Sequence, residues 1–299
     1  MRLKDLGEFS LIERIAKTLQ FSSKVIEGIG DDAAVFKYKK DRYFLFTSDM
    51  LVEGRHFYRK SGGFLIGKKS LSASVSDIAA MGGIPEFALI SLGAPGSLDV
   101  GYVDELYRGV RNVARGFKID LIGGDTVASD KIIINIALLG EVEKKNLVLR
   151  SGAKSGDSIF VTGTIGGALR GRHLSFEPRL KETRFLVKNF KINSMIDVSD
   201  GLIADLGHIL KSSRIGSVIY EKDIPLSRSA KDFESAITDG EDFELVFTVS
   251  KSDAQRLIKI WPFKTRLSKI GECSSHKGLY LARKNGKNVS LKPEGYTHF

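Results

Sequence analysis

The amino-acid sequence predicts a protein of mixed α and β layers, divided into two domains. Apolar, strand-like runs alternate with helical patterns along the chain, which favours this class over an all-α or an all-β fold. The 299 residues suffice for two domains of roughly 150 residues each. Hydrophobic residues make up 42% and charged residues 27% of the chain, so there is enough apolar material for a sizeable core.

The strand-like runs are rich in β-branched, aromatic and leucine residues, the types that suit a pleated sheet. They are too continuously apolar for strands that face water on one side. We therefore expect these strands to be covered on both faces. They lie at residues 43–49, 86–93, 119–124, 131–142, 158–163, 217–221 and 243–249.

Helical patterns lie between these runs, and a further apolar helical pattern begins at Gly201. The composition changes at RSGAKSGDSIF, where a turn rich in Gly, Ser and Lys follows one strand and precedes another. We therefore place a boundary close to residue 150, with domains at 1–148 and 149–299. The other helical patterns cover residues 67–83, 102–117, 178–190 and 253–261.

The net charge of +10 raises the possibility of a nucleic-acid partner. The basic residues are scattered, however, mostly beside turn-like residues, and no basic motif interleaved with aromatic residues is present. We therefore expect a solvated basic surface and no nucleic-acid partner. Such a surface is compatible with a small anionic substrate.

No stretch approaches the roughly 20 apolar residues that span a bilayer, so no membrane partner is expected. The first residues, MRLKDLGEFS, lack the apolar segment of a signal peptide, and we expect a cytoplasmic protein. The single cysteine, Cys273, excludes an internal disulfide and a cysteine-based metal cluster. We interpret Cys273 as a small hydrophobic residue.

Carboxylates recur beside the predicted ends of strands, often next to glycine. Asp is a common turn and helix-capping residue, so a single site of this kind would carry little information. Four sites of the same form favour a magnesium centre for phosphoryl transfer, because magnesium prefers carboxylate and water oxygens. The four groups are Asp31 and Asp32; Thr47, Ser48 and Asp49; Asp125 after Gly123 and Gly124; and Asp197, Ser199 and Asp200.

Asp77 lies in SLSASVSDIAAMGG, a helical stretch of small and apolar residues. An ionised Asp is a poor helix former and is costly to bury. Its neighbours at helical spacing include no cationic residue. We therefore expect the Asp77 carboxylate to bind a metal ion or a proton. The alternative is that this carboxylate faces water between two small residues.

Two phosphate-binding patterns are incomplete. GGFLIGKKS has Gly62, Gly67 and Lys68 at the spacing of a P-loop, but Lys69 stands where the motif requires Ser or Thr. GIGDDA lacks the third glycine of a dinucleotide fingerprint. The five histidines lie apart, and no Ser-His-Asp signature is present. These patterns therefore predict neither a P-loop nor an NAD site.

Taken together, these segments resemble the thiamine-monophosphate kinase family, part of the ATP-binding superfamily that includes aminoimidazole ribonucleotide synthetase and selenophosphate synthetase. The resemblance covers nearly the whole chain. The acidic segments are similar across the superfamily, whereas VEGRHF and the terminal GYTHF point to this kinase family. The other matching segments are GEFSLIERI, GIGDDAAVF, SVSDIAAMGGIP, LIGGDT, RSGAKSGDSIFVTGT, IDVSDGLIADLGHI and GEDFELVFTV.

The resemblance implies an α+β fold of two-domain, PurM-like architecture, with mixed sheets packed with helices. The N-terminal half would dimerise through its sheet and bind ATP and magnesium, and the C-terminal half would complete the nucleotide and substrate site. The implied reaction is direct in-line transfer of the ATP γ-phosphate to thiamine monophosphate, giving thiamine diphosphate. ATP would be the co-substrate, and several Mg²⁺ ions would be bound.

The resemblance also implies a role for each motif residue. Asp49, Asp125 and Asp200 would act in catalysis through the metal ions. No general base is expected, because a phosphate oxygen is already a nucleophile near neutral pH. The implied metal ligands are Asp32, Thr47, Ser48, Asp49, Asp77, Asp125, Asp197 and Asp200; the implied ATP contacts are Tyr107, Gly124, Asp125, Arg150 and Ser199; the implied thiamine monophosphate contacts are His56, Glu241 and Tyr296.

Two features depart from the family's pattern: the segment at 165–180 is short, and Asp239 replaces a glycine beside Glu241. Another PurM-like synthetase, with a different small phosphate or an amide as acceptor, is one alternative. A nucleotide-binding module without catalysis is another. Selenophosphate synthesis is disfavoured, because Cys273 lies far downstream of the glycine-rich N-terminal segment.

Overall fold

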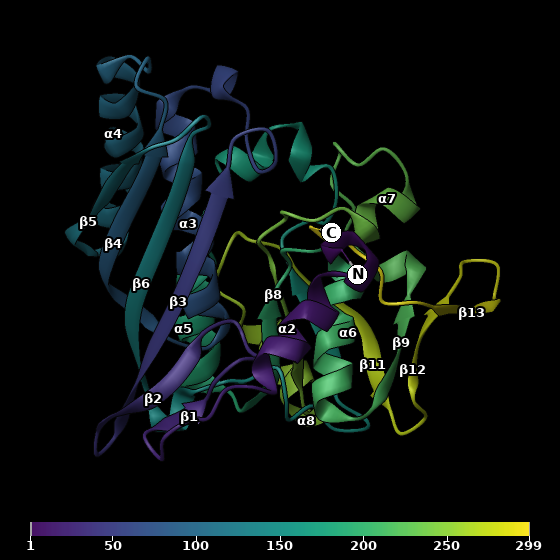
Figure 1. Cartoon of the computed structure of the whole chain (residues 1–299). Helices are drawn as coiled ribbons and strands as arrows, with labels where there is room; N and C mark the ends of the chain where they lie inside the picture. Colours follow the sequence, from purple (N-terminus) through teal and green to yellow (C-terminus); the bar gives the residue numbers. More distant parts are fainter. Residues whose placement is uncertain (1, 299) are drawn as a thin grey trace.

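Two β-sheets, each with helices packed against it, make up the protein (Figure 1). The computed structural model describes residues 2–298, so Phe299 of the GYTHF segment lies outside the described residues. In the first sheet the strand order is β1-β2-β3-β6-β4-β5; β4 and β5 are parallel, and the other neighbours are antiparallel. These strands are β1 (Val25–Glu27), β2 (Ala34–Lys39), β3 (Arg42–Val52), β4 (Ile84–Ala94), β5 (Asp120–Ala128) and β6 (Ile133–Glu143).

The second sheet has the order β13-β12-β9-β11-β7-β10-β8. Its strands pair antiparallel except for β12 and β9, which are parallel. The strands are β7 (Ser158–Thr162), β8 (Ile192–Asp197), β9 (Gly216–Tyr220), β10 (Leu245–Val249), β11 (Leu267–Ser274), β12 (Gly278–Ala282) and β13 (Asn288–Leu291).

The helices pack on these sheets and between them. Helix α3 contacts β3, β4 and β6 of the first sheet and also β8 of the second, so it lies at the junction of the two halves. The α-helices are α1 (Leu3–Leu6), α2 (Glu8–Ala16), α3 (Gly63–Ala80), α4 (Val100–Phe117), α5 (Leu180–Asn189), α6 (Leu202–Ser213), α7 (Phe233–Thr238) and α8 (Lys251–Ile260), and the 3₁₀ helices are η1 (Arg59–Ser61), η2 (Lys144–Asn146), η3 (Ala168–Arg170), η4 (Arg172–Leu174) and η5 (Glu221–Asp223).

Helices α3 and α4 approach each other at glycines. A Cβ on Gly67 would lie 1.9 Å from the carbonyl oxygen of Leu106, and one on Gly109 would lie 2.0 Å from the carbonyl oxygen of Phe64. Any larger residue at either position would push the helices apart. Gly67 and Lys68 of the incomplete P-loop pattern thus lie in helix α3, and Gly67 allows α4 to pack closely against it.

The N-terminal helix α2 lies against α6 in the second half of the chain. The rings of Phe9 and His208 are 5.0 Å apart, and Lys211 forms a 2.8 Å ion pair with Glu13. The backbone N–H of His298 donates to Glu8 at 2.8 Å. The two termini therefore lie close together (Figure 1).

The two sheets differ in how their faces are covered. Every residue of β7 and β10 is buried, and separate apolar cores lie on the two faces of the second sheet. In the first sheet, β6 alternates between buried and half-buried residues, and one face carries exposed side chains such as Phe46 and Leu89. The expectation that all strands are covered on both faces is therefore wrong for the first sheet.

The predicted runs match strands of both sheets, but their ends differ. The prediction placed Asp49 and Asp125 at strand ends; β3 continues to Val52 and β5 to Ala128, so both carboxylates lie within strands. Residues 144–157 connect the two sheets, and the predicted domain division at 148 and 149 falls within this segment; the division stays a prediction. In the described part of the chain, no helix combines the length and apolarity needed to cross a membrane.

Candidate active site

Three carboxylates meet where α3 faces both halves of the chain. Asp77 lies in α3, Asp197 ends β8, and Asp32 lies in the turn before β2. One carboxylate oxygen from each lies within 4.8 Å of the others. Asp77 thus lies in a group of acids and does not stand alone in water, and its role as a metal ligand stays a prediction.

Small hydroxyl residues orient these carboxylates. Thr47 Oγ1 donates to Asp77 at 2.6 Å, and Ser76 Oγ donates to Asp197 at 2.5 Å. Ser74 Oγ donates to Asp49 at 2.7 Å, which places Asp49 on the same side of β3 as Thr47. Two serines of α3, Ser74 and Ser76, thus donate to carboxylates from the two halves of the chain.

Arg150, from the segment between the sheets, holds the Asp31–Asp32 pair. Its guanidinium donates to Asp32 Oδ1 at 2.6 Å, and its backbone N–H donates to Asp31 at 2.9 Å. The second oxygen of Asp32, Oδ2, is buried and has no hydrogen-bond partner among the described residues. An unpartnered carboxylate oxygen in a buried site calls for a proton or a cation.

Burial and mutual repulsion raise the pKa values of these acids. Burial, together with the charge of Asp32, raises the pKa of Asp197 to about 8. Burial also raises the pKa of Asp77 well above its ordinary value, with Asp49, Asp197 and Asp32 adding to it. Several carboxylates this close cannot all be ionised unless a cation is present.

The residues of this cluster fit divalent magnesium. They offer hard oxygen donors, several carboxylates and one buried oxygen without a hydrogen-bond partner among the described residues, while Arg150 pairs with Asp32. The donors that the structure brings together are Asp32, Thr47, Asp49, Asp77 and Asp197, with Asp31 behind them.

Asp200 lies beyond the end of β8, beside the C-terminal segment. Its carbonyl oxygen accepts from the N–H of Tyr296 at 2.9 Å. The ring of Tyr296 lies 5.1 Å from that of His298, which in turn lies 5.1 Å from His56. The structure therefore connects the metal candidate Asp200 with Tyr296 and His56, two of the residues expected to bind thiamine monophosphate.

Glu241 joins this group through a residue that the sequence interpretation missed. Both of its carboxylate oxygens lie 2.6 Å from Lys69 Nζ, which also donates to the carbonyl oxygen of His56 at 2.6 Å. The carbonyl oxygen of Ser199 accepts a 2.7 Å hydrogen bond from the backbone N–H of Glu241. The sequence did contain a signal, a lysine among the small and apolar residues of α3, but it was considered only as part of a P-loop.

Other expected site residues lie away from this cluster. Ser48 Oγ donates to Asn135 on the opposite face of the first sheet from Asp77. Asp125 pairs with Ser91, which pairs with Asn135, so Asp125 lies on that opposite face as well. Tyr107, on α4, packs against the N-terminal core.

Gly124 is required by the sheet itself. A Cβ at this position would lie 1.7 Å from the carbonyl oxygen of Ile90 on the neighbouring strand. The glycine before Asp125 therefore has a structural reason in β5, independent of any nucleotide contact.

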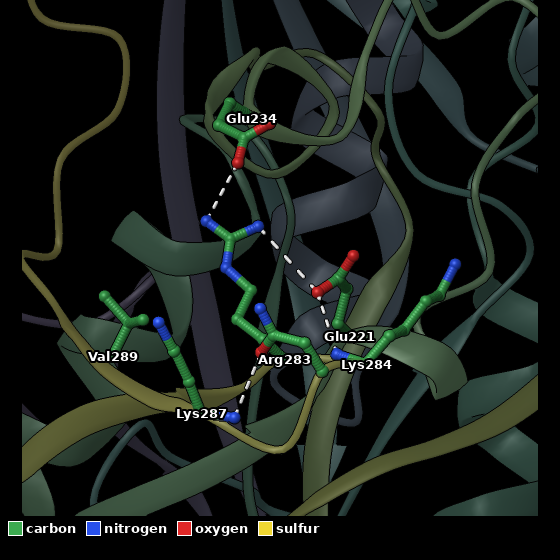
Figure 2. Close-up of a pocket in the computed structure, with 7 residues that line it drawn as sticks. Glu221, Glu234, Arg283, Lys284, Lys287 and Val289 are labelled. Atoms are coloured by element: carbon green, nitrogen blue, oxygen red, sulfur yellow. Dashed lines mark hydrogen bonds and ion pairs between the residues drawn. The ribbon is translucent and has the colours of Figure 1, made fainter.

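A cavity of about 420 Å³ lies elsewhere, beside the β12–β13 hairpin (Figure 2). There Arg283 lies between Glu221 and Glu234, at 3.8 and 2.8 Å, and its guanidinium packs 5.3 Å from the ring of Phe233. The two glutamates of this cavity are thus paired with Arg283. This cavity contains none of the residues singled out from the sequence.

The comparisons with known proteins agree with the motifs. The model for "AIR synthase related protein, N-terminal domain" matches residues 30–142. The curated "Thiamine-monophosphate kinase" of Aquifex aeolicus (strain VF5) is 36% identical, over 100% of both chains. The chain belongs to the thiamine-monophosphate kinase family. The family member of Bacillus subtilis (strain 168) is 34% identical over 98% of this chain and 100% of its own.

A solved structure of the family has the same fold. The structure described as "AaThiL complexed with AMPPCP and TMP" superposes with a TM-score of 0.87 at 35% identity, covering 100% of this chain and 99% of its own. Membership of the thiamine-monophosphate kinase family and the α+β, PurM-like fold are therefore confirmed. Because this family consists of phosphotransferases, the protein is an enzyme.

Proposed function

We propose that the protein phosphorylates thiamine monophosphate to thiamine diphosphate with ATP as the phosphoryl donor. Full-length similarity to thiamine-monophosphate kinases supports this reaction, as does the related structure described with AMPPCP and TMP. The observation that carries the proposal is the group of carboxylates formed by Asp32, Asp77 and Asp197. The loop after Asp197 joins this group to two of the expected substrate contacts, because the carbonyl oxygens of Ser199 and Asp200 accept the N–H groups of Glu241 and Tyr296.

The chemistry explains the number of acids. Two unit charges about 4 Å apart repel by about 4 kcal/mol at an effective dielectric constant near 20, and donor and acceptor phosphates present several such pairs. When bound, Mg²⁺ would neutralise this repulsion and hold the phosphates. The residues of one chain that would hold it are Asp32, Thr47, Asp49, Asp77, Asp197 and Asp200, whereas the other two expected ligands, Ser48 and Asp125, lie on the opposite face of the first sheet.

The protein's own residues would mainly position the two substrates, which is most of what phosphoryl transfer requires. Arg150 holds Asp31 and Asp32 in place and is itself an expected ATP contact, together with Tyr107, Gly124, Asp125 and Ser199. His56, Glu241 and Tyr296 would contact thiamine monophosphate. A phosphate oxygen can attack without a general base, so the reaction would be a direct in-line transfer.

We also propose that the protein acts as a homodimer through the exposed face of the first sheet. A shallow apolar cavity of about 260 Å³ opens on this face, and its lining continues to further exposed side chains such as Met50. Contiguous apolar surface of this kind is typical of an interface. The lining residues are Phe36, Phe46, Phe87, Leu89, Ile122, Ala137 and Leu139.

The position of Ser48 and Asp125 supports the dimer. Both lie on the sheet face opposite Asp77, beside the apolar surface, so neither reaches the acidic group of its own chain across the sheet. In a dimer built on this face both would lie at the interface, and Asp125, on the edge strand β5, could pass the edge of the partner's sheet and complete the partner's site. The cytoplasmic location expected from the sequence remains a prediction.

Product analysis tests the reaction. Purified protein is incubated with ATP and magnesium, with thiamine monophosphate or free thiamine as the acceptor, and the products are separated by chromatography. Thiamine diphosphate and ADP should form from thiamine monophosphate alone. If neither acceptor yields ADP or AMP, the kinase proposal fails, and another PurM-like synthetase reaction becomes the leading alternative.

A further inference from the structure

Lys69 is a lysine with almost no contact with solvent. Its side chain, in the middle of α3, is 1% exposed, and lysines are rarely buried to this degree unless they are paired. Its ammonium has three N–H donors, and three acceptor atoms lie 2.6 Å away: both carboxylate oxygens of Glu241 and the carbonyl oxygen of His56. The protein therefore provides an acceptor for every donor.

The backbone around Glu241 is held in an unusual conformation. Glu241 and Phe243 have φ angles of 63° and 50°, a region that non-glycine residues seldom adopt. Such conformations persist when the surroundings fix them, and they cluster at functional sites. Here the neighbouring acidic side chains Asp242 and Glu244 are hydrogen-bonded within the second half of the chain. Asp242 accepts from the N–H of Gly166 at 2.8 Å, and Glu244 accepts two 2.6 Å hydrogen bonds from Arg179.

With this backbone conformation, the Glu241 side chain points toward the first half of the chain and forms an ion pair with Lys69. The other acceptor of Lys69, His56, lies in the turn that follows β3, and its Nδ1 accepts from the N–H of Val52 at 3.0 Å. One ammonium thus joins two of the three residues proposed to contact thiamine monophosphate, and the two come from different halves of the chain.

We propose that Lys69 is a positioning residue for thiamine monophosphate, which fixes the Glu241 carboxylate and the His56 turn in the arrangement that binds this substrate. The inference rests on the proposed function and concerns the same site. Lys69 has no free N–H with which to bind a phosphate, because Glu241 and His56 occupy all three. A purely structural role is also a poor explanation, since a buried ion pair is seldom more stable than apolar residues of similar size.

The test compares steady-state kinetics of Lys69→Met with those of wild type. We expect KM for thiamine monophosphate to rise by about tenfold or more, the size expected for a lost charged hydrogen bond, with KM for ATP and kcat nearly unchanged. The matched control is Lys68→Met, which removes the same charge from the neighbouring position of α3. Lys68 donates to the carbonyl oxygen of Ser175, and within residues 2–298 no hydrogen bond or ion pair joins it to a proposed substrate residue, so its variant should keep wild-type constants.

A double-mutant cycle with Glu241→Gln identifies the route of the effect. If Lys69 acts through Glu241, adding Lys69→Met to Glu241→Gln should raise KM for thiamine monophosphate little further. The proposal would be overturned if the double variant raised KM for thiamine monophosphate by the product of the two single-variant increases. A Lys69→Met enzyme with reduced kcat and an unchanged KM for thiamine monophosphate would also overturn it, because that result would assign the lysine to the transferred phosphate.

Circular dichroism and thermal melting establish whether Lys69→Met folds. If it does not, Lys69→Arg carries the test, because it keeps the charge but moves the donors. A raised KM for thiamine monophosphate alone would then support the proposal, and a wild-type KM or a loss confined to kcat would overturn it. A wild-type enzyme that makes no thiamine diphosphate would instead refute the proposed function, and the inference would fall with it.

Discussion

Arg150 donates a 2.6 Å hydrogen bond to Oδ1 of Asp32, while Oδ2 of the same carboxylate is buried without a partner among the described residues. The guanidinium of Arg150 thus bonds to one of the two oxygens of Asp32, and Asp32 belongs to a group that also contains Asp77 and Asp197. Arg150 also lowers the pKa values of Asp197 and Asp31, but burial outweighs its charge and both pKa values stay raised. Proton binding and metal binding must therefore compete at this site.

Without a divalent cation, the protein should become less stable as the pH rises. The pKa of Asp197 is raised from 3.8 to about 8 by burial and by Asp32, and that of Asp31 is raised to about 7 for the same reasons. Between about pH 4 and pH 8 the folded chain therefore binds more protons than the unfolded chain, and the free energy of unfolding falls as pH increases. In EDTA, we expect a lower Tm at pH 8 than at pH 6.

Magnesium should oppose this trend, because it replaces protons at the carboxylates and binds the folded chain. The increase in Tm on adding MgCl₂ should be larger at pH 8 than at pH 6. Scanning calorimetry at both pH values, with KCl of matched ionic strength as the control, measures it. A metal-free Tm that rises with pH, or an equal effect of magnesium at both values, would contradict the proposed cluster.

Asp49→Asn and Asp125→Asn should each reduce kcat/KM by about 100-fold or more, because an amide lacks the charge that holds the metal. The fold should persist, since neither side chain packs in an apolar core. Kinetics at limiting magnesium and near-ultraviolet circular dichroism measure the two effects. Asp130→Asn, at an exposed position beyond β5, is the control and should behave like wild type. Near-wild-type kinetics in both test variants would remove these residues from the site.

Local patterns were enough to identify the acids of the cluster. Asp77 is out of place in a helix of small residues, and Asp197 follows an apolar run, so each could be singled out from its neighbours alone. That Asp32 would meet them depends on α3 contacting both sheets. Such long-range packing has no local signal in a single sequence.

The face on which Ser48 lies could have been predicted. Successive side chains of a strand point to opposite faces, so Ser48 could not share the face of Thr47 and Asp49 once the strand was known to continue past them. The strand was predicted to end at 49, and this concealed the alternation. The pairing of Lys69 with Glu241 could not have been predicted, because it depends on how the two halves meet.

The exposed face of the first sheet should hold a dimer together. Ile122 is 60% exposed on this face, and Ile122→Lys should shift the protein to monomers in sedimentation velocity, since a buried lysine without a partner is costly. Val100→Lys is the control, because Val100 is 73% exposed at the start of α4 and does not line the apolar cavity. A wild-type monomer, or a dimer that survives Ile122→Lys, would refute this interface.

Mixing two inactive variants should restore activity if the site is shared between subunits. Asp77 belongs to the acidic group, whereas Asp125 lies on the opposite sheet face, at the proposed interface. A heterodimer of Asp77→Asn and Asp125→Asn would then carry both changes in one site and neither in the other. After random exchange of subunits, about a quarter of the sites would be intact, because half of the dimers are mixed and each has one such site.

The exchange needs unfolding and refolding of the mixed variants, followed by the thiamine diphosphate assay. Each variant refolded alone is the control for recovery, and a mixture of Asp77→Asn with Asp49→Asn is the matched negative control. Asp49 lies on the same sheet face as Thr47, which donates to Asp77, so that pair should restore nothing. If the Asp77→Asn and Asp125→Asn mixture also stays inactive while wild type refolds to full activity, both residues serve the site of their own chain.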